Sequence, residues 1–204
     1  MTTSTANTPV LALYIDCEAE KRLDALCLLN WFSKKPLDAN GIQVLSLQSA
    51  GSASKSVLRN QALELKVAQF IAFIDPTIEI NWPELAASAE GLKRLSQQDC
   101  VTVEERRTNQ SGPETTVQYG LGNPMQTTPP PGSTICRQPA NSRCFWRADL
   151  VRDLKFDDAR TTDEFSASEF AWSLKAASRS ETTFHLSLNL YRSTGINGNK
   201  QLAT

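Results

Sequence analysis

The sequence lacks any apolar run of the roughly 20 residues that a membrane-spanning helix requires, so we expect no membrane insertion. It has a single histidine and five cysteines without a Cys-x-x-Cys pair, which argues against a zinc site or a disulfide framework. The formal net charge is only −1, so nothing global attracts nucleic acid or an anionic membrane. Glycine-rich phosphate loops of the P-loop and dinucleotide types are also missing.

The remaining composition is that of a globular protein, with 40% hydrophobic and 21% charged residues. Residues 1–9 are rich in Thr, Ser and Asn and have neither the basic nor the apolar region of a secretory signal. An odd number of widely spaced cysteines is typical of reduced thiols. Because thiols stay reduced in the cytosol, we expect a cytoplasmic protein. Residues 1–9 and 193–204 are interpreted as terminal tails.

Apolar runs and helix-start signals alternate along the first third of the chain. Buried strands are predicted at 10–15 (VLALYI), 42–47 (IQVLSL) and 70–74 (FIAFI). Amphipathic spacing predicts helices at about 20–32 and 57–67, the second capped by Ser54 or Ser56. This order favours a parallel sheet with right-handed crossovers, in which ligands lie at the carboxyl ends of the strands.

The pattern is less regular further along. The elements predicted there are helices at 83–95, 147–154 and 164–177 and strands at 100–103, 115–119, 143–146 and 184–191. The proline-rich stretch 107–140 is expected to be largely irregular. The mixed-sign run 104–107 (EERR) is interpreted as solvated surface.

Several segments resemble the motifs of family two glycosyltransferases of the GT-A fold. Residues 59–63 (RNQAL) followed by 69–77 (QFIAFIDPT) are similar to its Ala-Arg-Asn helix start and its strand ending in Asp-x-Asp. Later segments follow in the family's order: 141–154 (NSRCFWRADLVRDL), 156–158 (FDD), 163–177 and 190–192 (LYR). The resemblance covers about residues 10–192.

The resemblance implies one α/β domain over residues 10–192, with a mostly parallel central sheet and helices on both faces. Residues 10–103 would form a Rossmann-like nucleotide-sugar half, and residues 104–192 an acceptor half with the loop 107–140. The implied activity is that of an inverting hexosyltransferase, which transfers a sugar from a nucleotide-activated donor to an acceptor hydroxyl.

The same resemblance places Asp75 beside the donor's diphosphate, where family members hold Mn²⁺ or Mg²⁺ with carboxylates. Thr77 replaces the second acidic residue, so metal affinity should fall, and Glu79 is a displaced substitute. The other interpretation of Asp75 is a plain turn at the end of a strand.

Further nucleotide-binding candidates lie at the ends of the other predicted strands. Asp16 either binds the nucleotide or caps the helix that follows it. Gln48 and Ser49 replace the acidic pair that binds uridine in the family, and they offer hydrogen bonds without charge. Arg59 either contacts phosphate or anchors its loop.

Two residues are candidates for the general base that removes the acceptor's proton. Alignment on the following aromatic residues selects Glu169, whereas keeping an acidic pair selects Asp163. Both are also explained as acidic residues favoured by a helix dipole. The lone histidine, His185, begins an alternating strand and is interpreted as structural.

Arg137, Arg143 and Arg147 flank the implied acceptor side, where they hold an anionic group or are simply solvated. Two functions remain open: an active glycosyltransferase, or a degenerate member that binds or assembles with an active partner. The missing acidic residues motivate the second. A different nucleotide-binding α/β protein is the third alternative.

Overall fold

The computed structural model describes residues 9–17, 41–48, 54–65, 68–75, 77–109, 114–120 and 134–195. The strands are β1 (Leu11–Cys17), β2 (Ile42–Gln48), β3 (Phe70–Ile74), β4 (Glu79–Ile80), β5 (Cys100–Asn109), β6 (Thr115–Gly120), β7 (Thr134–Pro139), β8 (Phe145–Arg147) and β9 (Thr183–Gly195). The helices are α2 (Lys55–Glu64), α3 (Trp82–Arg94), α4 (Ala148–Val151) and α5 (Thr162–Arg179). The helix predicted at 20–32, Ser49 and residues 1–8 and 196–204 of the predicted tails lie outside the described residues. Residues 193–195 were predicted to begin the C-terminal tail but belong to β9.

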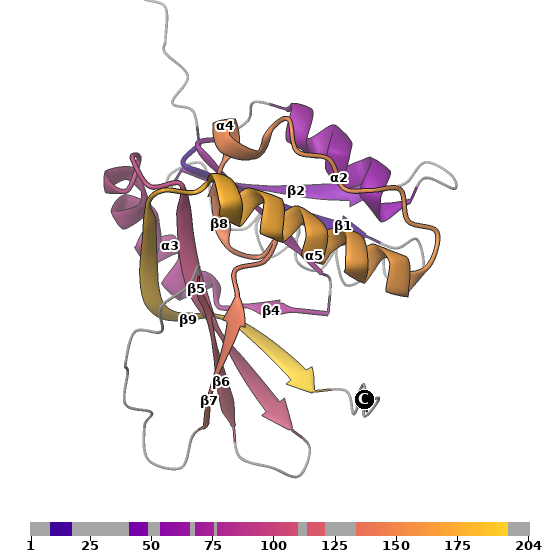
Figure 1. Ribbon diagram of the computed structural model, residues 1–204. Helices are drawn as coiled ribbons and strands as arrows, with labels where there is room; N and C mark the ends of the chain where they lie inside the picture. Colours follow the sequence, from indigo (N-terminus) through magenta and orange to yellow (C-terminus); the bar gives the residue numbers. More distant parts are fainter. Residues whose placement is uncertain are drawn as a thin grey trace, which may run out of the picture.

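The strands form one nine-stranded sheet in the order β2-β1-β3-β8-β5-β6-β7, with β9 beside β5 and β4 (Figure 1). Among the described strands, β1 pairs in parallel with β2 and β3, as do β5 with β9 and β6 with β7. The pairs β3–β8, β4–β9, β5–β6 and β5–β8 are antiparallel.

The sheet is therefore mixed, and the expectation of a mostly parallel sheet is wrong. One parallel part is the β2-β1-β3 unit, in which α2 connects β2 to β3. Residues 110–114 link β5 to β6, and this link is too short for the crossover of a dozen or more residues that a parallel pair needs. β5 and β6 therefore pair as an antiparallel hairpin, and the alternation of strands and helices ends at this point of the chain.

Two layers of helices cover the sheet, and β3 shows why its sequence is apolar throughout. Phe70, Ala72 and Ile74 pack into the core under α3, and Ile71 and Phe73 pack into the core under α2 and α5. Figure 1 shows α2 and α5 running side by side over the same face. A strand buried on both faces has no polar side, as predicted for residues 70–74.

Local signals set the helix boundaries near the site. Ser54 is one of the two predicted caps. It caps α2, because its Oγ accepts a hydrogen bond from Val57 N. Thr161 and Glu164 form a capping box at the start of α5. Within the described part of the chain, no helix has the length and apolarity needed to span a membrane.

Some expectations about the second half are wrong in detail. β5 continues to Asn109, so the run 104–107 lies in a strand, and Glu104 and Glu105 are buried rather than solvated. The strand predicted at 115–119 is present as β6, whereas β7 lies in the stretch expected to be irregular. β5 and β9 are both longer than predicted because they pair with each other along most of their length.

Candidate active site

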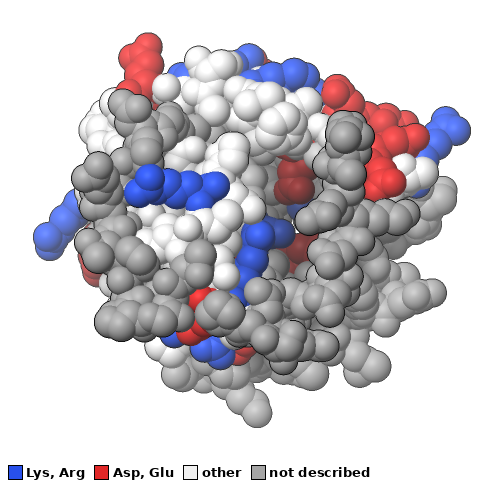
Figure 2. Space-filling model, turned by 60° about the horizontal axis from the view of Figure 1, so that its bottom comes forward, with Lys and Arg blue, Asp and Glu red and all other residues white. Residues whose placement is uncertain are grey.

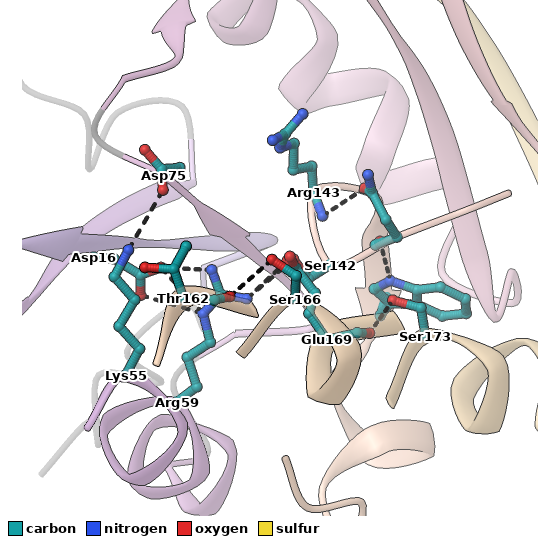
Figure 3. A network of polar contacts seen from close by, with 12 residues as sticks. Asp16, Lys55, Arg59, Asp75, Ser142, Arg143, Thr162, Ser166, Glu169 and Ser173 are labelled. Atoms are coloured by element: carbon teal, nitrogen blue, oxygen red, sulfur yellow. Dashed lines mark hydrogen bonds and ion pairs between the residues drawn. The ribbon is translucent and has the colours of Figure 1, made fainter. Parts of the chain in front are cut away.

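A buried guanidinium joins three elements at the carboxyl end of β1. Arg59, from α2, donates from Nε to both carboxylate oxygens of Asp16 at 3.2 Å. Its Nη1 donates to Ser142 Oγ at 3.1 Å and to Glu169 Oε1 at 3.0 Å. Ser142 Oγ also donates to the same Glu169 oxygen. We call these four residues the Arg59 cluster (Figure 3).

Aromatic rings enclose this guanidinium. Its central carbon lies 5.0 Å, 5.4 Å and 4.8 Å from the ring centroids of Phe73, Phe156 and Phe165. Only 3% of the Arg59 side chain is exposed, and the same holds for Asp16. Burial alone would lower the pKa of Arg59, but the charges of Asp16 and Glu169 raise it, so Arg59 stays cationic.

Glu169 is the member of the Arg59 cluster that reaches solvent, with 29% of its side chain exposed. Burial favours the protonated acid, but the positive charge of Arg59, the Ser142 hydroxyl and the charge of Arg143 together lower the pKa. Glu169 is therefore a carboxylate at neutral pH. Among the described residues, its contacts all use Oε1, and no donor engages Oε2.

A cavity of about 1000 Å³ opens beside Glu169, between α5 and the strands β5, β6, β7 and β9. Its polar lining includes Gln118, Arg137 and Asn141. Phe170 and Leu174 add apolar surface from α5 and are 56% and 50% exposed. A mostly apolar lining with several polar groups suits an amphipathic or polyhydroxylated ligand.

A second charged cluster lies on the neighbouring loop and sheet. Arg143 Nη1 donates to Glu105 Oε2 at 2.8 Å, and Arg107 Nε donates to Glu105 Oε1 at 3.0 Å. The Tyr119 hydroxyl donates to the same carboxylate. Burial would raise the pKa of Glu105, but Arg143, Arg107 and the hydroxyl donors lower it to about 2. We call Glu105, Arg107, Tyr119 and Arg143 the Glu105 cluster.

Asp75 follows β3 and forms the turn that was its alternative interpretation. Its Oδ1 accepts from Thr77 N at 2.9 Å and from Thr77 Oγ1 at 2.7 Å, and Lys55 Nζ lies 3.5 Å from Oδ2. Burial is outweighed by the two Thr77 donors and by the charges of Lys55 and Arg143, so the pKa of Asp75 is lowered. The carboxylate is ionised.

A divalent cation fits this arrangement poorly. Thr77 stands at the position of the family's second acid and uses its hydroxyl hydrogen on Asp75. The other Asp75 oxygen faces an ammonium group. Glu79 lies in β4 with an exposed side chain. Within the described ranges, no three His, Cys, Asp or Glu side chains gather as a metal site.

The other predicted residues do not take part in the Arg59 cluster. Asp163 lies exposed in the first turn of α5, away from the Arg59 cluster contacts. Gln48 ends β2, and its side chain and Ser49 lie outside what the structure describes. Arg147 pairs with Asp99 at 2.7 Å. His185 contacts Thr102 through Nδ1 at 2.9 Å and Glu104 through Nε2 at 3.3 Å, beside the cavity.

Lys55 and four cluster residues were not site candidates in the sequence interpretation: Ser142, Glu105, Arg107 and Tyr119. Lys55 follows the helix cap Ser54, which was the only local signal for its position. Ser142 and Glu105 reach their partners through contacts 27 and 38 residues apart along the chain. On the face seen in Figure 2, acidic and basic side chains lie next to one another at a hollow.

Comparison with known proteins reveals similarity at the level of the fold. No family model matches the sequence, and no curated protein matches it. Residues 1–349 of S. aureus TarS match with a TM-score of 0.56 and 15% identity, over 91% of this chain and 60% of that one. The same fragment in complex with UDP gives a TM-score of 0.57, also with 15% identity and the same coverage of both chains.

A longer structure of S. aureus TarS gives a TM-score of 0.56 at 14% identity, and the match covers 91% of this chain and 37% of that chain. This chain therefore spans at most 60% of these neighbours' lengths. Identity this low supports a conclusion about the fold alone. The chain shares the fold of S. aureus TarS, built here as a single mixed α/β unit.

Proposed function

We propose that this protein is a glycosyltransferase that moves a sugar from a nucleotide-activated donor to an acceptor hydroxyl. The observation that carries the proposal is Glu169, an ionised carboxylate fixed by Arg59 and Ser142 at the wall of a large cavity. The likeness to a UDP complex of the same fold supports a nucleoside diphosphate as the donor's leaving group.

In this proposal the donor lies at the carboxyl ends of β1 and β3, with its diphosphate near Asp75. The acceptor occupies the cavity between α5 and the sheet, so that its hydroxyl faces Glu169. Glu169 takes the hydroxyl proton as the oxygen attacks the anomeric carbon and the bond to the diphosphate breaks. Attack from the side opposite the leaving group inverts the configuration.

Within this mechanism, Asp16 and Arg59 act as positioning residues. Both side chains are almost fully buried, and Arg59 connects the end of β1 to Glu169. A carboxylate with a lowered pKa is a weak base, so its proton transfer should accompany bond formation rather than precede it. Arg59 thereby fixes both the place and the protonation state of the base.

The first experiment is nucleotide binding followed by turnover. UDP or GDP should raise the melting temperature, because a ligand that binds only the folded state stabilises it. Hydrolysis or transfer from the matching nucleotide sugar should fall about 10²- to 10⁴-fold in Glu169→Gln, with nucleotide binding unchanged. Asp163→Asn is the matched control and should retain wild-type turnover. The reverse pattern would transfer the role of base to Asp163.

A non-catalytic binding or assembly subunit is the second candidate. The specific observation in its favour is Thr77, which leaves Asp75 without an acidic partner among the described residues. Nucleotide binding without any hydrolysis or transfer, unchanged in Glu169→Gln, would establish this candidate and reject catalysis.

A further inference from the structure

The Asp75 carboxylate already has a positively charged group beside it, the ammonium of Lys55. Lys55 is the first residue of α2, and its Nζ lies 3.5 Å from Asp75 Oδ2. The same ammonium lies 5.7 Å from the ring centroid of Phe165. Figure 3 shows Lys55 extending from α2 toward Asp75 at the end of the sheet.

The Lys55–Asp75 distance is compatible with a second anion beside the ammonium. A separation of 3.5 Å is longer than a normal charged hydrogen bond, so the pair is loose. Lys has three N–H donors, and its side chain is 29% exposed. Asp75 keeps two Thr77 donors on its other oxygen when the ammonium turns toward a ligand.

A further positive charge acts at the same place. The charge of Arg143 lowers the pKa of Asp75 together with that of Lys55. Glu105 is shared between Arg143 and Arg107, so the Glu105 cluster carries one positive charge in excess. The Lys55–Asp75 pair is neutral, so it does not cancel this excess.

We propose that the Lys55 ammonium takes the part that a divalent cation plays in this fold, so that the donor's diphosphate binds without metal. The proposal rests on the proposed function, because it concerns the same donor site. Lys55 contacts the diphosphate directly, and Asp75 orients Lys55 rather than ligating a metal. Arg143 adds charge from the other side.

Isothermal titration of the full chain with UDP, once in EDTA and once in MnCl₂, tests this. The dissociation constants should agree within about threefold. Lys55→Met should weaken binding in EDTA about 10- to 100-fold, since a charge-assisted contact is lost. Lys55→Arg keeps the charge and should retain most of the affinity.

Lys155→Met is the matched control, because Lys155 pairs with Glu64 at the opposite end of α2 with its side chain 50% exposed. It should bind UDP like the wild type. Circular dichroism on each variant separates loss of binding from loss of fold, and Lys55→Gln replaces Lys55→Met if the latter unfolds.

The inference is overturned if Mn²⁺ tightens UDP binding tenfold or more, or if Lys55→Met binds as tightly as the wild type. Either result leaves the proposed function standing, because UDP still binds. If neither UDP nor GDP binds in EDTA or MnCl₂, the proposed function and this inference fall together.

Discussion

Replacing Arg59 with methionine tests whether the Arg59 cluster holds the site together. The change leaves the Asp16 carboxylate buried, with 3% of its side chain exposed and its main partner removed. It also removes one of the donors to Glu169. Methionine can fill the space between the Phe73, Phe156 and Phe165 rings, so the loss should be electrostatic rather than steric.

Breaking a buried ion pair by removing one partner costs about 3–5 kcal/mol, because an uncompensated charge remains in the interior. For a chain of this length, each kcal/mol lowers the melting temperature by about 2–4 °C. Arg59→Met should therefore melt about 6–20 °C below the wild type. Urea unfolding followed by tryptophan fluorescence and circular dichroism gives the free energy directly.

The matched control is Arg179→Met, which breaks an ion pair with Asp153 whose side chains are 41% and 70% exposed. It should leave the free energy of unfolding close to that of the wild type, because solvent and salt screen an exposed ion pair. Combining Arg59→Met with Asp16→Asn should cost less than the two single changes together, because the stranded charge is gone. A loss below about 1 kcal/mol for Arg59→Met would refute a buried, tightly coupled cluster.

Three further predictions concern pH, the start of α5 and the cavity. The pKa of Glu105 is lowered from 4.5 to about 2, so the unfolded chain binds a proton first as pH falls from 4.5. About 3 kcal/mol of stability is therefore present above pH 4.5 and lost by pH 2. The difference in unfolding free energy between wild type and Glu105→Gln should shrink across that window, and a constant difference would contradict the assignment. Thr161→Ala removes the hydroxyl that accepts from Glu164 N and should cost about 1 kcal/mol in urea unfolding, an effect that an unchanged midpoint would disprove. Phe170→Ser, at an exposed cavity residue, should leave stability within about 0.5 kcal/mol but raise the KM for the acceptor; an unchanged KM would place the acceptor elsewhere.

The elements that could be predicted from the sequence are those whose pattern of apolar and polar residues reflects which of their faces are buried. β3 is apolar at every position because both its faces are covered, and its observed bounds match the prediction. β7, in contrast, has the sequence TICRQP and shows no clear alternation. It is a strand because it pairs with β6 over six positions, and this pairing depends on the rest of the fold.

In the site, too, single residues could be predicted from local motifs, whereas their contact partners lie far away in the sequence. Arg59, Asp75 and Glu169 were selected as candidates from segments that resemble a known family. Their partners could not be predicted, because Arg59 contacts Asp16 and Glu169 across 43 and 110 residues of chain. Glu105 looked like part of a solvated run, since the Arg143 that neutralises it follows 38 residues later.

Once the partners are known, the charges divide the site into two ends. The Arg59 cluster contains two carboxylates and one guanidinium, so it carries one negative charge in excess. The Glu105 cluster contains two guanidiniums and one carboxylate, so it carries one positive charge in excess. The proposed sugar transfer would use this polarity, because a proton would be taken up at the base while negative charge develops on the leaving diphosphate. Arg143 lowers the pKa of both Asp75 and Glu169, so its charge acts on the turn after β3 and on the Arg59 cluster. In the proposed mechanism, neutralising Arg143 should therefore weaken diphosphate binding and base ionisation together, whereas neutralising Lys55 should weaken diphosphate binding alone.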